Sequence, residues 1–74
     1  MNTIGTRLAD ARQAKHLTMK ELSDKVGCGY ATIMHYEYDL HSPRVDILAD
    51  ICKVLGVTLD YIVYGDNDGT IREE

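Results

Sequence analysis

Residues 17–43 read LTMKELSDKVGCGYATIMHYEYDLHSP, and this stretch predicts two short helices joined by a tight turn. Thr18 and Glu21 have the spacing of a capping box, in which a hydroxyl and a carboxylate each accept from a backbone amide at a helix start. The first of the two helices therefore begins near Met19. Gly27 is expected to end it, because glycine adopts a positive φ easily.

Each of these two helices has one apolar face. In the first, apolar residues occur at i, i+3 and i+7, namely Met19, Leu22 and Val26. In the second, Gly29 is an acceptable N-cap, and Ile33 and Tyr36 lie three residues apart on the same side. We therefore expect Tyr36 to pack in the core rather than to contact a ligand. The arrangement is that of a helix-turn-helix, whose second helix keeps one face free.

Three further helices are predicted around this pair. Ile4, Leu8 and Ala11 indicate a helix over residues 3 to about 15, starting at Asn2 or Thr3. After Pro43, a wide apolar stripe ends at Gly56 and consists of Val45, Leu48, Ile51, Cys52 and Leu55. Thr58 caps a short last helix that ends at Gly65. The sequence thus predicts an all-α, compact five-helix domain over residues 1–65, followed by a polar acidic tail over residues 66–74.

The composition favours a small intracellular protein that meets its partner on one side. The net charge is −4, but residues 1–44 carry six bases and five acids, whereas residues 45–74 carry two bases and seven acids. A nucleic acid would meet the first part, with the acidic part turned away. No secretory or membrane-spanning segment is apparent, which predicts a cytoplasmic location. Cys28 and Cys52 are read as reduced thiols rather than as a disulfide.

The order of features from Ile4 to Gly65 resembles the Cro and phage-repressor family of helix-turn-helix regulators, also called the xenobiotic-response-element family. The ordered set carries the resemblance: Ile4-Gly5, Arg12, Leu17-Thr18, Glu21-Leu22, Gly27, Thr32-Ile33, Glu37, Pro43, Leu55-Gly56-Val57 and Leu59. The resemblance implies a lambda-repressor-like fold that binds double-stranded DNA through the helix over residues 30–38. It also implies a structural ion pair between Arg12 and Glu37, in place of two unrelated surface charges.

The face that would read DNA departs from the family pattern. Met19 stands where the family often has glutamine, and Gly29 and Tyr30 stand where it often has serine followed by glutamine or arginine. The predicted base contacts are Tyr30, Ala31, Met34, His35 and Tyr38, a set with few bidentate base readers. For Tyr30 and Tyr38, packing remains as plausible a role as recognition. The predicted contacts to the DNA backbone are Lys20, Lys25, Thr32, His41, Ser42 and Arg44.

The last helix has more apolar surface than a single buried face requires. Five of the six residues from 59 to 64 are apolar or aromatic: Leu59, Tyr61, Ile62, Val63 and Tyr64. In relatives this region commonly forms a two-fold dimer, so these five residues are the predicted homodimer interface. The alternative is a helix that only caps its own core.

Two functions remain from different classes. The first is a sequence-specific DNA-binding transcriptional regulator, a repressor that acts by occupying an operator. The second is a protein-interaction module of the antitoxin or antirepressor type, in which the face containing Tyr30, Met34 and Tyr38 binds a protein. An enzyme is not expected, because Cys28 and His35 have no orienting third group. No cofactor, metal ion, small-molecule ligand or membrane partner is expected, and the six-residue spacing of His35 and His41 does not suit a helical metal site.

Overall fold

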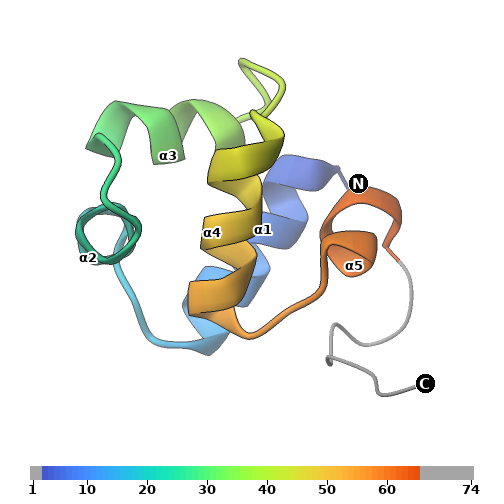
Figure 1. Cartoon of the computed structure of the whole chain (residues 1–74), viewed down its shortest axis with the longest axis horizontal. Coiled ribbons are helices and arrows are strands. Elements are labelled where there is room, and N and C mark those ends of the chain that lie inside the picture. Colours follow the sequence, from blue (N-terminus) through green and yellow to red (C-terminus); the bar gives the residue numbers. More distant parts are fainter. Residues whose placement is uncertain (1–2, 66–74) are drawn as a thin grey trace.

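The computed structural model describes residues 3–65, and this part of the chain consists of five α-helices without a strand. In chain order they are α1 (Ile4–Ala14), α2 (Met19–Val26), α3 (Tyr30–Glu37), α4 (Val45–Leu55) and α5 (Leu59–Tyr64). In Figure 1, α1 and α4 lie in the middle, α2 lies on one side and α5 on the other, and α3 runs along an outer edge. The predicted all-α class with five helices is confirmed. The acidic tail predicted for residues 66–74 lies outside the described residues.

The predicted signals at the ends of α2 are confirmed. The Thr18 hydroxyl accepts from the Glu21 amide at 3.0 Å, and Glu21 Oε1 accepts from the Thr18 amide at 2.8 Å. Gly27 ends the helix with a φ of 85°, a left-handed conformation that costs glycine little. A second capping box, between Thr3 and Thr6, starts α1. The turn between α2 and α3 begins at Gly27, where the Gly27 and Cys28 amides both donate to the Ser23 carbonyl, at 2.8 and 3.1 Å.

The core lies where the apolar faces of all five helices meet. Its most deeply buried apolar side chains are Leu8, Leu22, Ile33, Ile51, Leu55 and Ile62. Tyr36 is also buried, which confirms its predicted place in the core. Val45 is a correction, because it continues the apolar stripe of α4 in sequence but is 73% exposed. It is the first residue of α4, and its side chain lines an open surface groove with Leu59 and Tyr64 of α5 instead of entering the core.

A buried arginine joins α1 to α5. Arg7 is only 8% exposed, and its Nε and Nη2 donate to the carbonyl oxygens of Ile62 and Val63 at 2.7 and 2.9 Å. The last carbonyls of a helix have no partner within the helix, and the end of the helix dipole that they form attracts positive charge. Arg7 therefore satisfies the C-terminal end of α5 and fixes that short helix against α1.

Candidate nucleic-acid interface

The face of α3 opposite the core is turned to solvent. Ile33 and Tyr36 point inward, at 1% and 6% exposure. The structure leaves Tyr30, Ala31 and Tyr38 exposed among the predicted base-contact residues, and Met34 and His35 half-buried beside them. The five predicted residues thus lie on the outer side of one two-turn helix and on its C-cap. A two-turn helix with one free face is the shape that fits the major groove of B-DNA.

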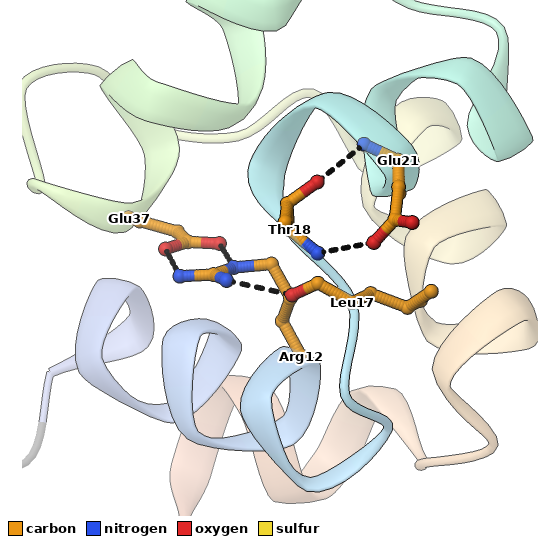
Figure 2. A network of polar contacts seen from close by, with 5 residues as sticks. All are labelled: Arg12, Leu17, Thr18, Glu21 and Glu37. Atoms are coloured by element: carbon orange, nitrogen blue, oxygen red, sulfur yellow. Dashed lines mark hydrogen bonds and ion pairs between the residues drawn. The ribbon is translucent and has the colours of Figure 1, made fainter.

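An ion pair holds the C-terminal end of α3 to α1 (Figure 2). Arg12 Nε donates to Glu37 Oε2 at 2.7 Å and Nη2 donates to Oε1 at 3.0 Å, while Nη1 donates to the Leu17 carbonyl at 2.8 Å. The side chains of Arg12 and Glu37 are 11% and 2% exposed. Hydrogen bonding to Glu37 raises the pKa of Arg12 above its ordinary value, so the guanidinium stays charged. One arginine therefore connects α1, the segment before α2 and the end of α3.

A second connection lies two residues beyond Glu37. Asp39 has a φ of 59°, and its carboxylate accepts from the Gly5 amide at 2.9 Å and from the Thr3 hydroxyl. A carboxylate at the start of a helix satisfies unpaired amides and complements the helix dipole. The backbones are so close that a Cβ on Gly5 would lie 2.3 Å from the Glu37 carbonyl oxygen. The orientation of α3 is thus fixed by backbone packing as well as by charge.

The predicted DNA-backbone contacts flank α3 on both sides. Lys20, Lys25, His41, Ser42 and Arg44 occupy these flanks, and Thr32 lies on α3 itself. Lys20 pairs with Asp24 at 2.9 Å, and Arg44 pairs with Asp46 at 3.1 Å. Surface pairs of this kind contribute at most about 1 kcal/mol, so a phosphate can displace the carboxylate at little cost. The Arg44 amide also donates to the Tyr36 hydroxyl at 3.2 Å, which anchors the far end of the loop after α3.

A shallow groove beside the N-terminal end of α3 adds two residues that the sequence pattern did not indicate. The groove has a volume of about 510 Å³ and lies between the start of α2 and Tyr30. Gln13 and His16 line it together with Lys20, so three side chains with hydrogen-bond donors share one concave surface. Gln13 lies in the last turn of α1 and His16 in the turn after it. Neither belongs to the apolar pattern of that helix. Their position only two to five residues before Thr18 is the one clue in the sequence.

The predicted dimer surface on α5 needs one correction. Ile62 is fully buried in the core, so it is not available to a second chain. Leu59, Tyr61 and Val63 are half-buried, and Tyr64 is 74% exposed. Because α5 has only six residues, the burial of Ile62 supplies its main contact with the core. A groove of about 400 Å³ lies beside this surface, and its lining includes Val45 and Tyr64, both strongly exposed.

Neither cysteine has the lowered pKa that favours a reactive thiolate. Both are free thiols; burial raises the pKa of Cys28 and raises that of Cys52 to about 11. A thiol nucleophile requires the opposite shift, because the thiolate is the reactive form. Among residues 3–65, no group of three or more His, Cys, Asp or Glu side chains is arranged to hold a metal ion. No helix in the same part of the chain is both long and apolar enough to cross a membrane.

Comparison with known proteins decides the family. Residues 8–62 match the family described as Helix-turn-helix. The chain belongs to this family. The HTH-type transcriptional regulator ImmR of Bacillus subtilis (strain 168) is 33% identical over 64 residues, which is 86% of this chain and 50% of ImmR. The chain thus spans about half the length of the curated relatives it matches.

Solved structures of other proteins have the same fold as this chain. The P22 c2 repressor protein, in complex with a synthetic operator, superposes with a TM-score of 0.84 at 24% identity, over 89% of this chain and 100% of that chain. SinR in complex with DNA gives a TM-score of 0.77 at 26% identity, over 81% of this chain and 97% of that chain. The predicted lambda-repressor-like fold and the resemblance to the Cro and phage-repressor family are confirmed.

Proposed function

We propose that this chain is a sequence-specific DNA-binding transcriptional regulator that inserts the outer face of α3 into the major groove. One observation carries the proposal: α3 keeps an exposed face while Arg12–Glu37 and Asp39 hold its C-terminal end rigidly against α1. A reading helix that is ordered before binding loses less conformational entropy when it meets DNA. The similarity to the DNA-bound SinR structure supports this proposal.

Within this function the contacts divide by chemistry. Tyr30, Ala31, Met34, His35 and Tyr38 would face base edges, where Met34 and Ala31 offer apolar contact to thymine methyl groups and His35 offers a donor or acceptor. Lys20, Lys25, Thr32, His41, Ser42 and Arg44 would hold phosphates and fix the register. Repression would follow from occupying an operator. A cytoplasmic location stays a prediction.

Replacing Lys25 or Arg44 with alanine should weaken binding to all duplexes alike. Each lost phosphate contact should reduce the slope of log affinity against log salt by about one unit. The measurement is fluorescence anisotropy with a labelled duplex at several salt concentrations. Lys53→Ala is the matched control, because Lys53 is an exposed base in the last turn of α4, and that end of α4 lies away from α3 (Figure 1). This variant should leave the slope unchanged. A wild-type protein that binds no duplex even at low salt would refute the proposed function.

We also propose that two copies pair through the exposed part of α5. The surface consists of Leu59, Val63 and Tyr64, continued by Val45 across the groove. Tyr61, which the sequence also placed in the interface, lines a different groove beside Leu55 and Val57. An apolar patch of this kind on a small domain is typical of an interface, and a two-fold pair would match a palindromic operator.

Tyr64→Asp should then shift the protein to monomer without unfolding it, because Tyr64 is 74% exposed and lies outside the core. Sedimentation equilibrium should show at least a tenfold weaker dimer, which corresponds to about 1.4 kcal/mol. Tyr38→Asp is the matched control, since Tyr38 is 62% exposed on the other functional surface and should leave assembly unchanged. Wild-type protein that remains monomeric at high micromolar concentration would exclude this interface.

A further inference from the structure

The imidazole rings of His35 and His41 are in direct contact. Their centroids lie 4.8 Å apart, with 65° between the ring planes, which is an edge-to-face arrangement. His35 is on α3 and half-buried, whereas His41 is exposed on the loop that follows. Two rings alone supply too few ligands for a structural metal site, so the contact calls for another explanation.

The loop that carries His41 is anchored at both ends. Asp39 is bonded to the start of α1 by Gly5 and Thr3, and the Arg44 amide is bonded to the Tyr36 hydroxyl. Next to His41, the Leu40 amide donates to the His35 carbonyl at 2.9 Å. The backbone around His41 is therefore fixed relative to α3, which keeps the ring of His41 beside that of His35.

A histidine ring on a helix surface rotates over a broad range of χ2, because the torsion between an sp³ and an sp² carbon has no sharp minima. A hydrogen bond to a base edge needs a defined direction. The ring of His41 lies edge-to-face against His35, where it would restrict this rotation. Without His41, the ring of His35 would have to be ordered when the protein binds DNA. This entropic cost would weaken binding to the correct sequence, where His35 bonds a base, more than binding to other sequences.

We infer that His41 is a positioning residue for sequence discrimination, which orients the ring of His35 toward the bases. This inference rests on the proposed DNA-binding function and gives His41 a second role beside its proposed phosphate contact, because a phosphate contact alone carries no direct sequence information. The imidazole of His35 remains the group that touches the base.

The test compares four variants on two duplexes, the site that wild type selects from a randomised library and an unrelated duplex of equal length. His35→Ala and His41→Ala should each lower the ratio of the two affinities by about threefold to tenfold, the range of a single hydrogen bond. His41→Phe keeps an aromatic ring against His35 and should keep the ratio within about twofold of wild type. The double variant His35→Ala/His41→Ala should discriminate no worse than His35→Ala alone, since both changes remove one interaction.

Opposite results overturn the inference. If His41→Ala weakens both duplexes equally, or if His41→Phe loses discrimination as fully as His41→Ala, His41 does not act through its ring on His35. Unchanged discrimination in His35→Ala would overturn it as well. Thermal melting should show that all variants fold, because neither ring belongs to the buried core. Failure of the proposed function has a different signature, since wild type would then bind neither duplex at low salt and both proposals would fall.

Discussion

Replacing Glu37 with alanine should lower the free energy of unfolding by about 3–5 kcal/mol, the cost of orphaning a buried charge. The variant would leave the Arg12 guanidinium, whose side chain is only 11% exposed, bonded to the Leu17 carbonyl without a carboxylate beside it. Domains are stable by roughly 0.05–0.15 kcal/mol per residue, so a chain of 74 residues would lose much of its total stability. Urea denaturation followed by circular dichroism measures the loss.

Two control variants separate charge from packing in this experiment. Glu37→Gln keeps the shape and one acceptor oxygen, so it should destabilise less than Glu37→Ala. The double variant Arg12→Met/Glu37→Leu removes both charges and should recover much of the lost stability, because well-packed apolar pairs often replace buried ion pairs without loss. A Glu37→Ala protein with the wild-type urea midpoint would show that the pair does not hold α3 in place.

Gly5→Ala should destabilise the fold by about 3 kcal/mol, at the upper end of the range for overpacking a filled site. The added Cβ would lie 2.3 Å from the Glu37 carbonyl oxygen and 2.7 Å from that of Tyr36. Both atoms belong to the backbone of α3, so the clash cannot be relieved by rotating a side chain. Because α1 and α3 would have to separate, the Asp39 bonds to Gly5 and Thr3 should also be lost.

Gly29→Ala is the matched control for this variant. Gly29 is the N-cap of α3 with an ordinary φ of −76°, and the nearest atom to the added methyl group would be Thr32 Oγ1 at 3.9 Å. The expected loss is below about 1 kcal/mol, since the N-cap position loses only a small preference. Equal melting temperatures for wild type and Gly5→Ala would mean that α1 and α3 are not packed as closely as described.

Features that depend on neighbouring residues could be predicted from the sequence. The capping box of Thr18 and Glu21 and the left-handed Gly27 follow from local backbone chemistry, so they are readable without the fold. The same reasoning failed at Val45 and Ile62. Helical periodicity shows which residues share a face, but it does not show where the neighbouring helices stop or which side of a six-residue helix turns inward.

Contacts between distant segments have weaker signals in the sequence or none. The pairing of Arg12 with Glu37 follows from family resemblance, because two charges 25 residues apart have no local pattern that joins them. Arg7 shares the buried face of α1 with Leu8 and Ala11, and this is the one sequence clue to its internal role. The ring contact of His35 and His41 depends on the left-handed turn at Asp39, which returns the chain toward α3.

Arg7 and Arg12 both project from α1, Arg7 to the end of α5 and Arg12 to the end of α3. A single continuous helix, α1, therefore holds both α3 and α5 in place. If two chains pair through α5, the separation of their α3 helices is set by this helix and has little freedom to adjust. One base pair inserted between half-sites would displace one of them by about 3.4 Å and rotate it by about 35° around the duplex. Such a protein would read the length of the spacer as strictly as it reads the bases on either side.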